Sequence, residues 1–193
     1  MNATASAHAH VFPSDLGWMA LAWRGERLCR LTFGHPSAAA AEAALESDLR
    51  KRPEEADTLP AWIGELVERL QGYAAGQEAR FDDVPLDLAH LSPFQLRVVQ
   101  ACRRIGRGRV RTYGELAAAA GSAGAARAVG NVMAANRFPI IVPCHRVVGS
   151  AGSLGGFSAR DGVRMKRRML EMEGAAQPRQ RRERRAGALA GRN

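Results

Sequence analysis

A cysteine stands next to a histidine and an arginine at Cys144, His145 and Arg146, directly after Pro143. The thiolate is the nucleophilic form of cysteine, and a neighbouring imidazole and guanidinium favour that charged form. The short apolar run 140–142 predicts a buried extended segment that Pro143 ends, because proline has no backbone donor for sheet pairing. We therefore expect Cys144 to lie where the core opens into a cleft and to act as a nucleophile.

A lone cysteine is more often an inert part of the core, so the neighbours of Cys144 decide the interpretation. Pro-Cys-His-Arg is followed by Val147-Val148-Gly149, by Gly152 and by Gly155-Gly156-Phe157-Ser158. Together these motifs resemble the active-site signature of the O6-alkylguanine-DNA alkyltransferases. The resemblance extends over about Ser92 to Gly174.

The resemblance implies a reaction for the thiol. Cys144 would attack the alkyl carbon on O6 of guanine, and O4-alkylthymine is a second substrate that the resemblance allows. His145 would deprotonate the thiol through a water molecule, and Glu173 would orient and stabilise the imidazolium. Because the product is a thioether with no activated carbonyl for water to attack, we expect one turnover per protein molecule and no cofactor.

The resemblance also implies how the base is held. Chemistry on a base inside a duplex requires that the base leave the stack. Tyr113 would turn the phosphate, hydrogen-bond the purine and protonate the departing guanine. The carbonyls of Cys144 and Val147 would accept from the exocyclic amine, and the amide of Ser158 would donate to O6. Asn136 would brace the active-site turn, and the loop residues Gly155, Gly156 and Phe157 belong to the same base-binding set.

Helices with clear starts precede the cysteine. Ser92 to Gln95 and Thr112 to Glu115 have the spacing of two capping boxes. A further helix is expected at about 125–135, after a short turn that contains glycine. Two short helices across such a turn predict a helix-turn-helix.

The second helix of this pair carries small residues on its expected outer face. Ala126, Gly130 and Ala134 leave Arg127 as its single long side chain. A recognition helix in the major groove normally carries several polar side chains, so this pattern indicates minor-groove insertion with little sequence readout. The resemblance implies that Arg127 fills the space left by the flipped base. On composition alone, a tightly packed Ala/Gly helix inside the domain remains the alternative.

Charge is divided unevenly along the chain. Residues 1–88 hold 8 basic and 14 acidic side chains, a net charge of −6, whereas residues 89–193 hold 20 and 5, a net charge of +15. The second half is therefore the candidate for binding nucleic acid. It includes the short basic loop Arg107–Arg111, which we expect to be flexible.

We expect four regions: a flexible lead at 1–10, an α/β domain at 11–88, a DNA-binding and alkyl-transfer domain at 89–174, and a basic disordered tail at 175–193. The α/β domain should hold a hairpin of strands 18–23 and 28–33, helices after Ser37 and over 59–73, and a strand over 84–88. The resemblance implies an RNase H-like fold for it. The second domain is expected to be all-α and winged-helix-like, with the helix-turn-helix.

The cysteines and the hydropathy of the chain indicate the cellular environment in which the protein works. The chain has three widely spaced cysteines and no Cys-x-x-Cys pair, which excludes a disulfide framework and argues against a metal site. We expect no signal peptide and no membrane span, because the sequence has no apolar run of about twenty residues. We expect a cytoplasmic monomer that binds double-stranded DNA containing O6-alkylguanine through the minor groove, with no membrane partner and no metal.

Three other functions fit the sequence less well. A damage-sensing module of the alkyltransferase-like kind would lack the reactive cysteine, but Cys144 is present. A Cys-His hydrolase would need an oxyanion-hole motif, and none is evident. A helix-turn-helix repressor would need a helix richer in base-reading side chains.

Overall fold

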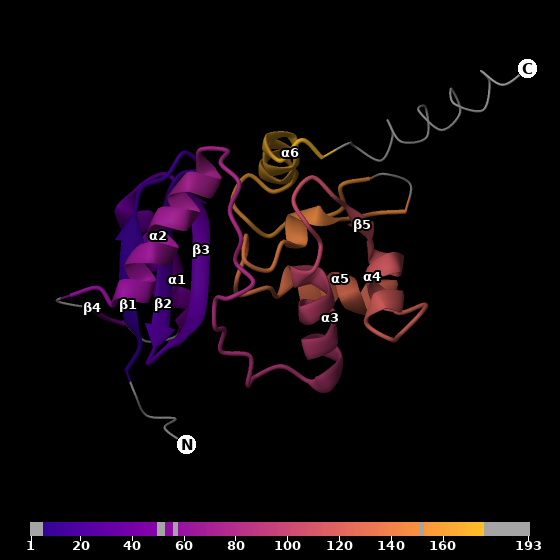
Figure 1. Ribbon diagram of the computed structural model, residues 1–193, viewed down its shortest axis with the longest axis horizontal. Coiled ribbons are helices and arrows are strands. Elements are labelled where there is room, and N and C mark those ends of the chain that lie inside the picture. The colour runs from indigo at the N-terminus through magenta and orange to yellow at the C-terminus, as the bar shows by residue number, and fades with distance from the viewer. Residues whose placement is uncertain (1–5, 50–52, 56–57, 151–152, 176–193) are drawn as a thin grey trace, which may run out of the picture. The chain divides into compact units, whose positions relative to one another are not determined.

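The computed structural model describes residues 6–49, 53–55, 58–150 and 153–175, which form two compact units (Figure 1). The first unit comprises the chain up to Leu91 together with Asn136–Ile141 and Ala159–Asp161. The second comprises Ser92–Ala135, Val142–Ser158 and the chain from Gly162 onward. The predicted tail is outside the described residues, except for Ala175.

The first unit is built on a sheet with the order β3-β2-β1-β4. Strands β1 (His8–Phe12), β2 (Trp18–Arg24) and β3 (Arg27–His35) are antiparallel, and the short β4 (Glu54–Glu55) pairs in parallel with β1. The predicted hairpin is confirmed, with Trp23 opposite Leu28. The N-terminal unit is thus α/β, as expected.

Two details of this unit correct the sequence analysis. The flexible lead at 1–10 is wrong for residues 8–10, which are part of β1 and pair with β2; residues 1–5 are outside the described range. The strand predicted at 84–88 is a single parallel bridge between Leu86 and Leu28. Pro85 has no N–H to extend a ladder there, although its carbonyl accepts from Leu28 N at 2.9 Å.

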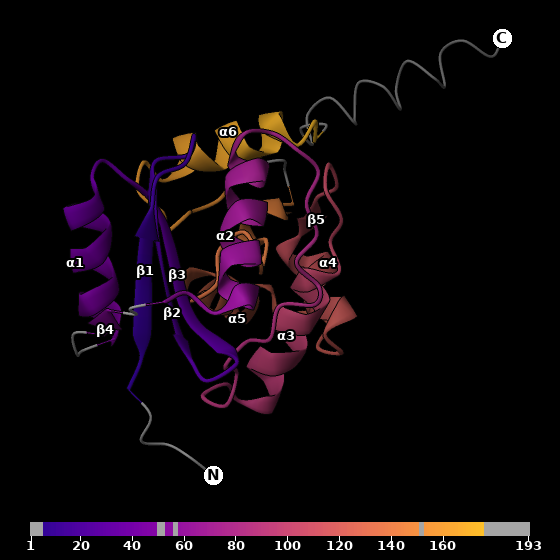
Figure 2. The same ribbon diagram turned by 60° about the vertical axis from the view of Figure 1, so that its left-hand side comes forward.

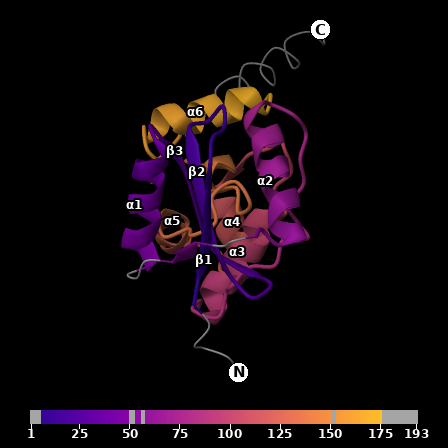
Figure 3. The ribbon, with the colours of Figure 1, turned by 90° about the vertical axis from the view of Figure 1, so that its left-hand side faces the viewer.

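Helices α1 (Ala38–Leu49) and α2 (Ala61–Ala74) lie on either side of the strands in Figure 3. The side chain of Ser37 accepts from Ala40 N at 3.2 Å and starts α1. The periodic apolar residues predicted for α2 are buried: Ile63, Leu66, Val67, Leu70 and Tyr73. Their spacing of three or four residues places them on one face of the helix.

The second unit is mainly helical, with α3 (Pro93–Arg103), α4 (Tyr113–Ala119), α5 (Ala126–Ala134) and α6 (Val163–Met172). Helices α3, α4 and α5 pack against one another, as Figure 2 shows. One feature was not predicted, a two-stranded parallel sheet of β5 (Arg111–Thr112) and β6 (Val147–Val148). This sheet ties the chain before α4 to the chain after Cys144.

Both predicted capping boxes are confirmed. Ser92 N donates to Gln95 Oε1 at 2.8 Å, and Gln95 N donates to Ser92 Oγ at 3.3 Å. In the second box Thr112 N donates to a carboxylate oxygen of Glu115 at 2.7 Å. The N–H groups in the first turn of a helix have no partner within the helix, and a capping box provides partners for them. The two boxes therefore determine where α3 and α4 begin.

The chain before Cys144 is not the extended segment that its apolar residues predicted. Residues 137–142 form turns and bends, and Ile140 has a φ of 73°, outside the strand region. Asn136 Oδ1 accepts from Phe138 N at 3.0 Å and so stabilises the first of these turns. The expectation was wrong because periodicity does not distinguish a buried strand from a buried irregular segment.

The described part of the chain contains no helix that is long and apolar enough to cross a membrane.

Candidate active site

Cys144 begins a short 3-10 helix, η1 (Cys144–Arg146), which leads directly into β6. Its side chain is 5% exposed and lines a cavity of about 480 Å³. The other lining residues come from α4, α5 and the loop before α6: Tyr113, Gly130, Met133, Ala134, Gly155, Gly156, Phe157 and Ser158. Six predicted site residues besides Cys144 therefore meet around one hollow.

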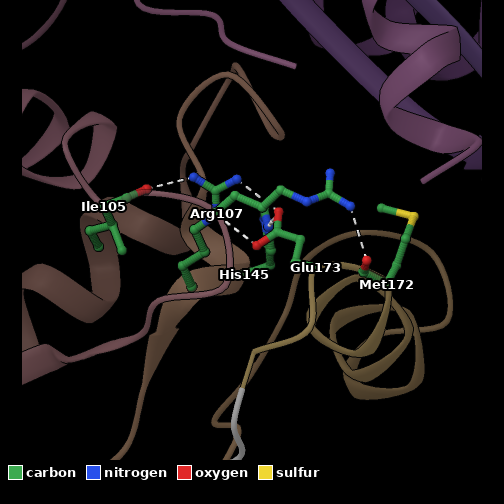
Figure 4. Close-up of polar contacts among 6 residues, drawn as sticks. Ile105, Arg107, His145, Met172 and Glu173 are labelled. Carbon is green, nitrogen blue, oxygen red and sulfur yellow. Dashed lines mark hydrogen bonds and ion pairs between the residues drawn. The ribbon is translucent and has the colours of Figure 1, made fainter. Parts of the chain in front are cut away.

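His145, the residue after Cys144, forms a buried pair with Glu173. The imidazole Nε2 lies 2.8 Å from Glu173 Oε1, and both side chains are enclosed (Figure 4). Burial lowers the pKa of His145 and so favours the neutral ring, although the hydrogen bond to Glu173 acts in the opposite direction. A neutral ring that donates from Nε2 to the carboxylate carries its lone pair on Nδ1. The pair can therefore act as a base.

Arg146 is the second partner of Glu173. Its Nε donates to Oε2 at 2.9 Å and its Nη2 to Oε1 at 2.8 Å, a two-pronged contact that fixes the carboxylate plane. Burial alone would raise the pKa of Glu173, but the hydrogen bonds from His145 and Arg146 outweigh it and hold that pKa well below its usual range. Glu173 is therefore ionised and aligned.

We expected the charge of Arg146 to act on the thiol of Cys144. In the structure its guanidinium instead forms hydrogen bonds with Glu173. Glu173 is the residue that ends α6, immediately after Met172. The end of α6 therefore holds the imidazole of His145, the residue that follows Cys144 in the chain.

The loop before α6 closes over the aromatic ring of Tyr113. Gly155 has a φ of 65°, and a Cβ at this position would lie 3.1 Å from Tyr113 Oη, so glycine is needed for both its backbone freedom and its small size. Burial and the nearby Cys144 thiolate raise the pKa of Tyr113. The phenol thus keeps its proton and can donate it.

Helix α5 presents the residues expected to meet DNA. Arg127 is exposed, Ala126 and Gly130 are half-buried, and Gly130 also lines the Cys144 cavity. Val129, Val132 and Met133 form the buried face. The smooth outer face predicted from the sequence is therefore present, and the alternative of a fully enclosed Ala/Gly helix does not hold for Arg127.

Asn136 lies in the first unit, where its hydrogen bond to Phe138 N shapes the turn that follows it. Its expected support of the active-site turn stays a prediction. Among the described residues, no group of three or more His, Cys, Asp or Glu side chains could hold a metal ion, and Cys29, Cys102 and Cys144 form no disulfide.

Comparisons with known proteins identify the family of this chain. The DNA binding domain of 6-O-methylguanine DNA methyltransferase matches residues 93–175. The methylated-DNA--protein-cysteine methyltransferase of Mycobacterium tuberculosis strain H37Rv is 44% identical over 119 residues, which cover 62% of this chain and 70% of that protein. The chain belongs to the O6-methylguanine DNA methyltransferase family. It is therefore a DNA-repair methyltransferase.

Other members of the O6-methylguanine DNA methyltransferase family are also similar to this chain in sequence and in fold. The enzyme of Methanothermobacter thermautotrophicus is 38% identical over 117 residues, 61% of this chain and 64% of that protein. The structure of Mycobacterium tuberculosis OGT in complex with DNA is 36% identical, with a TM-score of 0.69 over 86% of this chain and 92% of that chain. The methyltransferase of Pyrococcus kodakaraensis is 26% identical, with a TM-score of 0.65 over 88% and 99%. The chain thus has the two-part fold and the DNA-binding domain of the family.

Sequence reasoning missed Lys166, which lies in the methyltransferase site. It is fully buried, its Nζ donates to Val147 O at 2.6 Å, and it lies 5.9 Å from the ring centres of Tyr113 and Phe157. Burial lowers its pKa to about 8, against the opposing effect of the thiolates of Cys144 and Cys102. Its ammonium therefore favours negative charge on Cys144.

The helical period could have found this lysine. Lys166 stands three and four residues before Met169 and Leu170, two apolar residues that proved to be buried. Val163, the apolar residue three positions before Lys166, is instead 39% exposed. A lysine on an apolar face is a sign of a functional site that we did not use.

Proposed function

We propose that this chain removes the alkyl group of O6-alkylguanine, and of O4-alkylthymine, from double-stranded DNA by transferring it irreversibly to Cys144. The observation that carries the proposal is the position of Cys144 at the wall of a cavity of about 480 Å³, with the next residue in the chain, His145, held in a buried pair with Glu173. Each molecule acts once and needs no cofactor, because the thioether product offers water no activated carbon.

The transfer is an in-line displacement. The thiol proton passes through a water molecule to Nδ1 of His145, and Glu173 stabilises the imidazolium that forms. The sulfur forms a bond to the alkyl carbon as the bond from that carbon to O6 breaks. The electron pair stays on the guanine, which takes a proton from the hydroxyl of Tyr113, so that the neutral base departs. The raised pKa of Tyr113 keeps the phenol protonated, which is the form that this step needs.

Backbone groups recognise the flipped base. The carbonyls of Cys144 and Val147 accept from the exocyclic amine of guanine, and the amide of Ser158 donates to O6. The carbonyl of Val147 already accepts from Lys166, but a carbonyl oxygen has a second lone pair for the base. Gly155, Gly156 and Phe157 form the wall of the pocket, which supports their place in the base-binding set.

Helix α5 enters the minor groove. Its small residues Ala126 and Gly130 allow close approach to the duplex, and the exposed Arg127 fills the space that the flipped base leaves. Binding of this kind contacts few base edges, so it suits a protein that must find a lesion in any sequence. We further propose that the protein acts as a monomer, in a cytoplasm that keeps the thiol of Cys144 reduced.

The finer fold assignments belong to the same proposal. The strand order and flanking helices of the first unit are compatible with an RNase H-like fold. In the second unit, the β5–β6 pair beside the α4–α5 helices is compatible with a winged-helix-like domain. Asn136 braces the turn that leads to Cys144.

A labelled duplex tests the reaction. The protein is incubated with DNA carrying radiolabelled O6-methylguanine, and the label on the protein is located by peptide mass spectrometry. We expect at most one methyl group per molecule, on Cys144. The variant Cys144→Ala should bind the duplex and accept no label, while the matched variant Cys102→Ala should be methylated as usual. Label that stays on the DNA, or continued turnover, would contradict the proposal.

The role of Arg127 has its own test. The variant Arg127→Ala should transfer methyl groups more slowly from duplex DNA, because flipping loses support, but should react normally with the free base O6-methylguanine. Equal losses on both substrates would remove Arg127 from its assigned role.

A further inference from the structure

A second hollow of the DNA-binding unit has no part in methyl transfer. It has a volume of about 500 Å³ and is formed by one stretch of chain between α3 and β5, residues 104–111. Four of the eight lining residues are arginines, Arg104, Arg107, Arg109 and Arg111, and none of the eight is acidic. A concave surface with this composition is suited to an anion.

The loop is held in place, contrary to our expectation of flexibility. Arg107 Nη2 donates to Met172 O at 3.0 Å, and Arg146 Nη1 donates to Ile105 O at 2.5 Å (Figure 4). Gly108 has a φ of 70°, and a Cβ there would lie 3.1 Å from Glu173 O. These contacts fix the backbone on the end of α6, so the hollow is preformed and not a product of a solvated charge run.

The cationic groups of the loop are available for binding. Arg104, Arg109 and Arg111 are exposed, and within the described ranges no carboxylate forms an ion pair with any of the three. Neighbouring guanidinium groups repel one another unless an anion lies between them. Their planar, forked donors match the oxygens of a phosphate, which can accept two hydrogen bonds from one guanidinium.

The place of the loop in the chain indicates which phosphate it meets. Arg111 is the first residue of β5, and β5 leads directly into α4, whose first residue is Tyr113 of the Cys144 cavity. We propose that the 104–111 hollow binds phosphate groups of the DNA backbone outside the flipped nucleotide. This inference rests on the proposed function, because it adds a second contact to the DNA that brings the lesion to Cys144.

Salt dependence of DNA binding tests this contact. Affinity for an undamaged duplex is measured by fluorescence anisotropy over a range of salt concentrations. Each phosphate neutralised contributes about 0.9 to the slope of log affinity against log salt concentration. We expect Arg109→Gln to reduce the slope by about 0.9, and the triple variant of Arg104, Arg109 and Arg111 to reduce it by up to about 2.7.

Two controls separate this site from general charge and from the methyl transfer. Arg80→Gln removes an exposed arginine of the first unit and should leave the slope unchanged. Transfer from the free base O6-methylguanine to Cys144 should be equal in all these variants. A slope in the triple variant equal to that of the wild type, or a loss in Arg80→Gln equal to that in Arg109→Gln, would overturn the inference. Failure of the proposed function would show instead as no methylation of Cys144 in any variant.

Discussion

The two units bury different kinds of side chain. In the described part of the first unit, the buried residues are apolar or aromatic, such as Trp23, Leu45 and Tyr73. In the second unit four polar or charged residues are buried: His145, Arg146, Lys166 and Glu173. Burying charge is costly unless each group finds a partner, so this cluster lowers the stability that an apolar core would give. The charged core of the second unit therefore serves the chemistry of the protein and not its stability.

The largest effect should come from breaking the charged core at Glu173. Glu173→Gln leaves the Arg146 guanidinium buried without an ionised partner, and breaking a buried pair in this way costs about 3–5 kcal/mol. Chemical denaturation of both proteins measures the difference. If the variant unfolds at the same denaturant concentration as the wild type, Glu173 does not stabilise the buried charge of Arg146 as described.

The second effect is a dependence of stability on pH through Lys166. Its pKa falls from 10.5 in the unfolded chain to about 8 in the folded protein. Between these values the unfolded chain binds more protons, so stability rises with pH by up to about 1.4 kcal/mol per pH unit. Below pH 8 the cost of burying the charge is constant.

Lys166→Met isolates this contribution, because methionine has a similar volume and no charge. The stability of the wild type relative to the variant, measured by denaturation between pH 7 and 10, should increase above about pH 8. Parallel curves for the two proteins would show that the ammonium is not enclosed as described.

A smaller effect distinguishes a glycine at the site from a glycine elsewhere. Gly155 and Gly25 both have a positive φ, so Gly155→Ala and Gly25→Ala should each lose about 1–2 kcal/mol of stability. A Cβ at Gly155 would meet Tyr113, whereas one at Gly25 would meet nothing within 4 Å. Single-turnover methyl transfer should therefore slow only in Gly155→Ala. Equal transfer rates in the two variants would show that the close packing of Gly155 against Tyr113 does not matter for methyl transfer.

The smallest effect is expected in the first unit. Arg69 and Asp83 form an ion pair at 2.8 Å, but the carboxylate side chain is 66% exposed. Surface pairs of this kind contribute about 0–1 kcal/mol, so Asp83→Asn should change the denaturation midpoint very little. If Asp83→Asn lost as much stability as Glu173→Gln, a surface ion pair of the first unit would matter as much as the buried pair of the second unit.

The sequence was most informative where a local rule decides the structure. Both capping boxes depend on residues three positions apart, and the α2 pattern depends on the helical period, so these features could be predicted. Cys144 and His145 are neighbours in the chain, and their motif is recognisable without a structure. The cavity and the hydrogen bond from His145 to Glu173 then follow from the fold.

Features that depend on distant partners were missed. Strand β1 has the weak pattern His-Ala-His-Val-Phe and becomes a strand by pairing with β2. The bond from Arg146 to Glu173 spans 27 residues, and that from Lys166 to Val147 spans 19. The left-handed backbone of Ile140 is disfavoured for a β-branched residue, so no local preference predicts it.

The enclosure of Lys166 has a consequence for the spent protein. Its ammonium lies close enough to Cys144 for a thiolate there to raise its pKa, so it stabilises the negative charge that develops when His145 takes the thiol proton. Alkylation converts the sulfur to a thioether, which cannot ionise, and so removes this effect on the ammonium. We therefore expect the pKa of Lys166 to be lower in the methylated protein than in the unmodified one, which an NMR titration of the two proteins would detect. Each used molecule would then contain a buried amine that loses its proton more readily than before repair.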